Sequence, residues 1–273
     1  DADEVDHMLA DETAGRVTIG DQKITVTNAI TVDQANLLGA TTTGVVTATI
    51  ATTETVTELA TLNADGGTND LTIVIRAADA TAATATQLNT INAATAVAVD
   101  ASNVTGLASD SISNISTLLT AGNDTNQFTA NSFSSLATVV VNDTTLDVSD
   151  FIGAVDQANS ATGNTSTVFT ITAADTINGG TEANFSALLT DEGNSQVSIT
   201  DQNLTVDSGT VSVANAILLA ATTTGTVTAS ITTTERVSAL KTLYDAGETN
   251  AYTIVINALD AVIADAADLN TID

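Results

Sequence analysis

The sequence contains no cysteine, no proline and no tryptophan, and it has a single histidine. Without cysteine the chain has neither disulfide bonds nor thiolate metal sites, so its stability must come from burial of a core. Aromatic residues make up only 3% of the 273 residues, whereas 43% are hydrophobic, mostly Ala, Val, Ile and Leu. The chain should therefore fold, and its small aliphatic side chains favour thin repeated layers over one thick core.

Basic residues are also scarce, since five Lys and Arg stand against 33 Asp and Glu, which gives a formal net charge of −28. A field of this sign repels nucleic-acid phosphates and anionic lipids, so we expect no nucleic-acid partner. Apolar runs stay shorter than the roughly 18 residues of a membrane span, so we expect no membrane insertion. The sequence begins with acidic residues, whereas a signal peptide begins with basic ones. We expect the segment to come from within a larger protein.

The sequence carries an internal duplication. The run VTIGDQKITV at 17–26 returns as VSITDQNLTV at 197–206, and ATTTGVVTATI at 40–50 returns as ATTTGTVTASI at 221–231. The duplicated stretches are 17–92 and 197–273, and residues 93–196 form a less regular central part. Because no linker composition interrupts the chain, we predict one continuous repeat domain over residues 1–273.

A shorter period of about 25 to 30 residues combines a β-rich run, a helical run and a polar turn. Apolar and Thr residues alternate along 46–50, as in a strand with one buried face. A helix is expected over 54–62 with Thr52 or Thr53 as its cap, and Asp79 and Asp260 are predicted to cap alanine-rich runs. Strands are expected to begin near Val17, Val45, Leu71, Ala96, Gln127, Val168, Val197, Val227 and Tyr252.

Serial strand–helix–strand units require crossover connections and parallel pairing. We therefore predict an α/β fold, a right-handed repeat solenoid of strand–helix units with a parallel sheet. A parallel β-helix is the alternative if the Thr-capped segments are turns. Tandem β-sandwiches fit less well, because helical stripes are frequent and proline, their usual turn residue, is missing.

Residues for catalysis are few. The only histidine, His7, lies in an acidic stretch with no partner nearby, and the absence of cysteine excludes Cys/His nucleophilic sites. Paired carboxylates occur by chance among 33 acids and carry no weight without a cleft. We therefore predict that the chain is not an enzyme.

Calcium is the one metal that the composition favours, because it binds clustered carboxylate and carbonyl oxygens. The candidate ligands are Asp143, Asp147 and Asp150, although their spacing matches no known calcium loop. Thr-x-Thr pairs such as Thr47/Thr49 suggest an ice-binding face, but Thr is common on any exposed sheet.

The repeat motifs ATTTGVVTATI at 40–50, its copy at 221–231, and LNTI at 88–91 and 269–272 resemble segments of giant surface proteins. The resemblance is to repeat regions of very large cell-surface and secreted proteins of marine bacteria, such as the motility-associated giant surface proteins of marine Synechococcus. It covers about half the chain and implies an extracellular or cell-surface location. It defines no functional residues that could be carried over.

Two functions remain open at this level. The first is a non-catalytic structural repeat module of a large surface protein, forming a stalk, surface layer, filament or adhesin, whose partners are neighbouring modules of the same or identical chains. The second is a calcium-dependent adhesion module that binds a glycan or ice.

Overall fold

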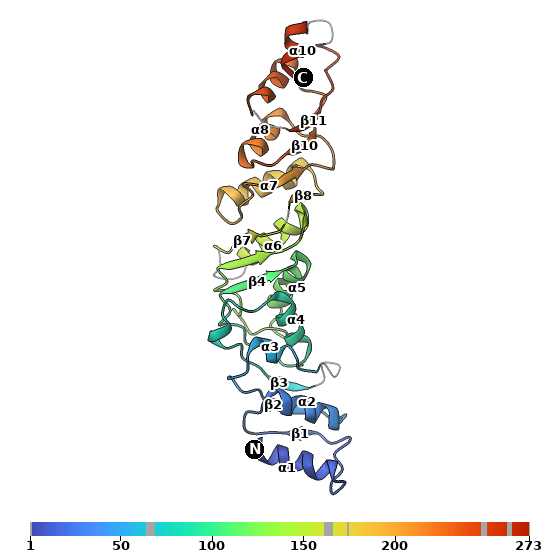
Figure 1. The fold of residues 1–273 in the computed structure, drawn as a ribbon, viewed down its shortest axis with the longest axis vertical. Helices are drawn as coiled ribbons and strands as arrows, with labels where there is room; N and C mark the ends of the chain where they lie inside the picture. The colour runs from blue at the N-terminus through green and yellow to red at the C-terminus, as the bar shows by residue number, and fades with distance from the viewer. Residues whose placement is uncertain are drawn as a thin grey trace. The chain divides into compact units, whose positions relative to one another are not determined.

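The computed structural model describes residues 2–63, 69–160, 166–173, 175–246, 250–260 and 264–272. These residues form a mixed α/β structure in which short strands alternate with helices along the chain (Figure 1). They divide into two compact units, Asp1–Val140 with Gln157–Thr167, and Val141–Asp156 with Val168–Asp273. The predicted α/β class and parallel pairing are confirmed.

Most of the longer helices begin at a Ser or Thr N-cap, whose side chain satisfies a backbone N–H of the first turn. The α-helices are α1 (Ala2–Thr13), α2 (Val32–Thr41), α3 (Val56–Leu59), α4 (Ala85–Ala93), α5 (Ile112–Gly122), α6 (Val148–Ser160), α7 (Glu182–Gly193), α8 (Val213–Thr222), α9 (Val237–Leu240) and α10 (Ala266–Ile272). Two 3₁₀ segments are η1 (Ala77–Asp79) and η2 (Lys241–Ala246).

The strands are short and rich in Thr and aliphatic residues. They are β1 (Ile24–Thr25), β2 (Val46–Thr49), β3 (Asp70–Thr72), β4 (Gly106–Asp110), β5 (Thr138–Val141), β6 (Thr145–Asp147), β7 (Val168–Ile171), β8 (Thr176–Asn178), β9 (Asn203–Thr205), β10 (Val227–Ser230) and β11 (Ala251–Thr253). Helices such as α2 and α8 connect successive parallel strands, so these connections are helical rather than the turns of a β-helix.

In the first unit, β1, β2 and β3 form a parallel sheet in chain order. Helix α1 packs on α2, α3 on α4, and α4 on α5, so consecutive strand–helix layers lie against one another. Leu38, Leu88 and Ile75 are fully buried between these layers. Because each layer contributes only a few aliphatic side chains, its burial depends on its neighbours.

In the second unit, β6, β8, β9, β10 and β11 form an open parallel sheet, again in chain order. The register places Leu146 beside Ile177, Ile177 beside Leu204, and Leu204 beside Val227. All four side chains are fully buried. The row is a continuous aliphatic contact across four strands.

The duplicated stretches fold into the same succession of elements. An offset of 181 residues relates Val32 to Val213 at the start of α2 and α8, and Val46 to Val227 at the start of β2 and β10. The same offset relates α3 to α9, β3 to β11, and the first residues of α4 and α10. The sequence repeat is therefore a repeat of local structure.

Several sequence predictions differ from the structure in detail. No strand begins at Val17, and the first strand is β1 at Ile24. The helix expected over 54–62 is only α3, and its cap is Thr55 rather than Thr52 or Thr53, because Thr55 stands three residues before Glu58 and forms a capping box with it. The expected strands near Leu71, Val168, Val227 and Tyr252 are confirmed by β3, β7, β10 and β11.

Among the helices of the described residues, none combines the length and the apolar character needed to cross a membrane.

Candidate functional site

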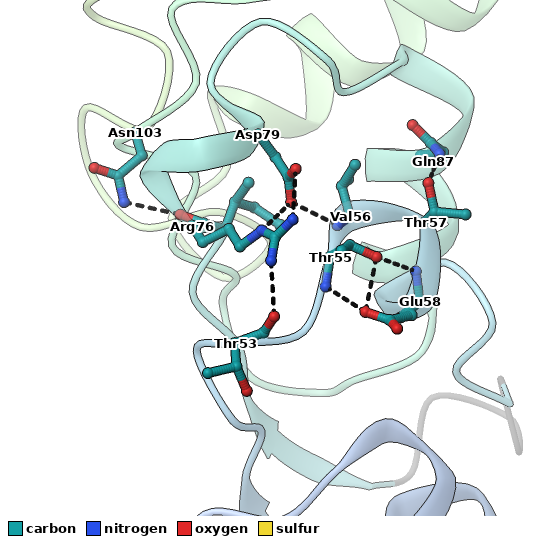
Figure 2. A network of polar contacts seen from close by, with 10 residues as sticks. Thr53, Thr55, Val56, Thr57, Glu58, Arg76, Asp79, Gln87 and Asn103 are labelled. Atoms are coloured by element: carbon teal, nitrogen blue, oxygen red, sulfur yellow. Dashed lines mark hydrogen bonds and ion pairs between the residues drawn. The ribbon is translucent and has the colours of Figure 1, made fainter.

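The clearest side-chain constellation lies where one strand–helix layer meets the next in the first unit (Figure 2). The carboxylate of Asp79 in η1 accepts a hydrogen bond from the backbone N–H of Val56, the first residue of α3, at 2.8 Å. Arg76 donates to the same carboxylate through Nε at 2.8 Å, and its Nη1 donates to the carbonyl of Thr53 at 2.8 Å. The Arg76–Asp79 pair therefore ties its own layer to the preceding one at two points.

The same helix end also has a local cap. The hydroxyl of Thr55 accepts the N–H of Glu58 at 3.1 Å, and the Glu58 carboxylate accepts the N–H of Thr55 at 2.7 Å. This capping box leaves the N–H of Val56 without an acceptor inside the helix, and the Asp79 carboxylate accepts it. On the outer side, Gln87 of α4 donates to the Thr57 hydroxyl at 3.3 Å.

Asp79 is an ionised, buried group. Its residue is only 7% exposed. Burial by itself raises the pKa of this carboxyl, but the hydrogen bonds from Arg76 and from the Val56 N–H outweigh it, and the net effect lowers the pKa. The carboxylate therefore stays charged and serves as an acceptor, which is the role that a helix N-terminus favours.

The second copy builds the same junction with its arginine in a different place. Asp260, which is 4% exposed, accepts the N–H of Val237 at the start of α9 at 2.8 Å. Its cation is Arg236, with Nη1 at 3.0 Å from the carboxylate. Arg236 occupies the position that Thr55 holds in the first copy, whereas the position of Arg76 is taken by Asn257. Asp260, like Asp79, is therefore paired with an arginine, but Arg236 comes from the preceding layer whereas Arg76 comes from the same layer as its aspartate.

Other helices are capped across the junction in the same direction. Asp110 accepts the N–H of Thr86 in α4 at 2.6 Å, and Glu235 accepts the N–H of Val213 in α8 at 3.1 Å. Burial raises the pKa of Asp110, yet hydrogen bonds from Asn114, Thr86 and the next N–H outweigh this and lower it. In each case the acid lies 22 to 24 residues after the N–H that it accepts.

Glu54 is the counterpart of Glu235 in the first copy, and its surroundings are less favourable. Burial and the charges of Glu58 and Asp33 raise its pKa, while a hydrogen bond from the Val32 N–H opposes that shift. Burial, and to a smaller extent repulsion from neighbouring acids, therefore disfavour the charged form of Glu54 that accepts the Val32 N–H.

A second contact between layers explains the ATTTG motif. The buried Thr42 hydroxyl donates to the carbonyl of Gln22 at 2.7 Å and accepts the N–H of Gly44 at 2.9 Å. A Cβ on Gly44 would overlap that Gln22 carbonyl, so only glycine fits there. The second copy repeats the arrangement with Thr223, Gly225 and Gln202.

One buried carboxylate lacks partners of this kind. Asp191 in α7 is 7% exposed, and its Oδ2 has no hydrogen-bond partner among the residues that the structure describes. Burial, with a smaller contribution from the charge of Asp156 in α6, raises the pKa of Asp191 to about 6. Ala94 and Ala121 stand at the same distance from the N-caps of α4 and α5 as Asp191 does from the N-cap of α7, and both alanines are buried. Asp191 therefore carries a desolvation cost at neutral pH.

The predicted calcium ligands lie around the start of α6. Asp147 caps this helix, because its Oδ1 accepts the N–H and hydroxyl of Ser149 and the N–H of Asp150. Asp143 lies in the turn between β5 and β6. Across the described ranges, no three acidic or histidine side chains come together in an arrangement that could hold a metal ion, so these three do not form such a group. Calcium binding by them stays a prediction.

Thr side chains from neighbouring strands of the first unit lie side by side. The register pairs Thr25 with Thr47, and Thr49 with Thr72. The row that contains Thr47 continues to Asp70, so a carboxylate follows the hydroxyls. The rows are short and mixed, and their binding of ice or a glycan stays a prediction.

Comparison of the chain with protein-family models, with curated proteins and with solved structures finds no match.

Proposed function

We propose that the chain is a non-catalytic structural repeat module of a large extracellular or cell-surface protein, in which the layers continue as a right-handed solenoid. In this role the module acts as a spacer, and its partners are neighbouring modules of the same or identical chains. It serves in a stalk, surface layer, filament or adhesin.

The observation that carries the proposal is the recurrence of one junction. Val56 and Val237 each donate their N–H to an aspartate of the following layer, and each aspartate is paired with an arginine. The acids of these two junctions, Asp79 and Asp260, act as acceptors in the contacts between layers. Such repetition suits a module whose stability grows by adding like layers.

The composition supports a surface location. The net charge of −28 and a polar surface of hydroxyls and amides are typical of proteins that face salt water rather than cytoplasm. The resemblance to giant surface proteins of marine bacteria points the same way.

Small-angle X-ray scattering of the whole chain tests the solenoid. A compact globule of 273 residues has a radius of gyration of about 19 Å. A stacked solenoid should give a clearly larger value, with the scattering of an elongated particle. A value close to that of the globule would overturn the proposal.

A melting experiment with and without millimolar calcium separates the scaffold from a calcium-dependent module. The scaffold predicts the same melting temperature in both, because its layers are joined by hydrogen bonds and aliphatic contacts. A rise of several degrees in calcium would favour the alternative of a calcium-dependent adhesion module.

A further inference from the structure

A small hollow lies in the first unit, between the end of α5 and the segment that follows it. Its volume is about 180 Å³. Its lining includes four apolar side chains, of which Leu119, Phe133 and Ala158 are buried and Ala130 is exposed. Gly122 and amide and hydroxyl side chains line the rest. The lining is therefore more polar than that of a typical small-molecule site, which is mostly apolar, and it suits a ligand that carries many hydroxyl groups.

The segment that forms this hollow departs from the repeat. Between Gly122 at the end of α5 and Thr138 at the start of β5, the chain has no helix and no strand. Structureless connections of this length are uncommon in compact folds and are frequently functional. In repeat proteins, insertions of this kind often form the binding face.

The segment is nevertheless held firmly. Phe128 and Phe133 pack edge to face with ring centroids 5.1 Å apart, and the Phe133 ring lies against Gly122, where a Cβ would collide with it. Asn131 adopts a left-handed backbone conformation at φ 67°, and its carbonyl accepts the N–H and the hydroxyl of Ser134. The hollow is therefore preformed, and binding would cost little ordering of the chain.

Three polar side chains around the hollow are available to a ligand. The amides of Asn123 and Asn131 and the hydroxyl of Thr125 make no side-chain hydrogen bond within the described part of the chain. Elsewhere in the layers, amides and hydroxyls such as those of Asn103 and Thr95 are bonded to neighbouring layers.

We propose that this hollow binds one uncharged sugar unit of a neutral glycan. Amides and a hydroxyl provide both donors and acceptors for sugar hydroxyls, and exposed Ala130 with the small exposed part of Phe133 provides a limited apolar surface for the carbon skeleton. Pockets for drug-sized ligands have volumes of about 300–1,000 Å³. This smaller hollow can therefore hold only one sugar ring, and the remaining sugars of the glycan would stay outside it.

The charge of the protein excludes other ligand classes. Among the described residues, no Lys, Arg, Asp or Glu lines the hollow. An acidic sugar or phosphate would find no cation and would be repelled by the net charge of −28. A calcium ion would find no carboxylate. The proposal does not rest on the structural role proposed above.

The test uses the full chain on an array of neutral oligosaccharides, with sialylated and uronic-acid oligosaccharides as the acidic set. The best neutral hit is then titrated by calorimetry against Asn131→Gly, Thr125→Val and the control Asn28→Ala, which changes an exposed amide in another layer. Asn131→Gly removes the amide but keeps the left-handed backbone, and circular dichroism verifies that each variant is folded.

Binding of a neutral glycan that falls at least tenfold in Asn131→Gly and Thr125→Val, and is unchanged in Asn28→Ala, is the expected result. Three results would overturn the proposal: no neutral glycan binds, only acidic glycans bind, or the two hollow variants bind as well as the parent chain. Scattering is measured on the same sample, so failure of this site is distinguishable from failure of the solenoid.

Discussion

Asp79 accepts the backbone N–H of Val56, and these two residues belong to successive layers. The bond completes a helix of one layer with a side chain of the next, so the two layers gain from being adjacent. The equivalent bond between Asp260 and Val237 shows that the second copy of the repeat retains this device.

Asp79→Ala should lower the free energy of unfolding of the first unit by about 1–3 kcal/mol, because it leaves the Val56 N–H buried without an acceptor and Arg76 without its anion. Asp79→Asn keeps an oxygen acceptor and should cost less. Urea denaturation followed by circular dichroism measures both.

The matched control is Arg16→Gln, which breaks the ion pair with Asp11. The side chains of this pair are 72% and 44% exposed, so the change should cost less than about 1 kcal/mol. The prediction is wrong if Asp79→Ala and Arg16→Gln have equal effects.

The displaced arginine of the second copy allows a rescue experiment. Arg236→Gln should destabilise the second unit, because Asp260 is buried and loses its cation. Adding Asn257→Arg places an arginine where the first copy has Arg76, and it should restore most of the loss.

The two single variants and the double variant form a thermodynamic cycle. A favourable coupling between positions 236 and 257 of at least about 0.5 kcal/mol is expected. Additive effects would show that the arginine cannot be exchanged between layers.

Gly44→Ala and Gly225→Ala should each be strongly destabilising, because the new Cβ overlaps a backbone carbonyl of the previous layer, which cannot move away alone. Gly153→Ala is the control. Gly153 lies inside α6 with no atom within 4 Å of a new Cβ, so alanine should be neutral or stabilise by about 0.5–1 kcal/mol. If thermal melts showed that Gly44→Ala and Gly153→Ala change the melting temperature equally, the steric argument would be wrong.

The stability of the second unit should fall as the pH rises through 6. The pKa of Asp191 is raised to about 6 in the folded protein, against about 3.9 in an unfolded chain. The folded state therefore favours the protonated form of Asp191. The stability that this preference gives to the second unit is fully present below pH 4 and is lost as Asp191 ionises.

Asp191→Asn should raise the free energy of unfolding at pH 8 by roughly 1–3 kcal/mol and should have little effect at pH 4. Asp156→Asn, which removes the neighbouring charge alone, should give a smaller gain. The difference between variant and parent curves cancels the general repulsion among acids, so a difference that does not change with pH would refute the prediction.

The cap and calcium roles of Asp147 make different predictions. As an N-cap of α6, Asp147→Ala should cost about 1 kcal/mol in calcium-free buffer, whereas Asp147→Asn should be nearly neutral. As a calcium ligand, Asp147 should affect melting only when calcium is added. Melts of both variants with and without EDTA decide between the two roles.

The sequence predicts the local structure well where the residues that determine a strand or helix all lie within one layer. The alternation along Val46, Ala48 and Ile50 correctly gives β2, because burial of one sheet face depends on these residues alone. It correctly places helices after Thr-rich runs. It misplaces the cap at Thr52 or Thr53, because several Thr residues compete and only Thr55 has an acidic partner three residues later.

The sequence is least informative where one layer meets another. The prediction that Asp79 caps the alanine-rich run after it is wrong, because Asp79 accepts the Val56 N–H at the start of α3 in the preceding layer, and the N-cap of α4 is Thr84. Its partner is fixed by the stacking register, which no local pattern contains. The recurrence of an acid 22 to 24 residues after a helix start is the signal that could have shown it.

The direction of these caps makes the two sides of a layer unequal. Peeling away the later layer strips a helix of an acceptor and leaves a bare N–H, whereas peeling away the earlier layer leaves a carboxylate that water can solvate. If the layers stack as in the proposed solenoid, the caps formed by Asp79 and Asp260 should make unzipping under mechanical tension differ between its two ends.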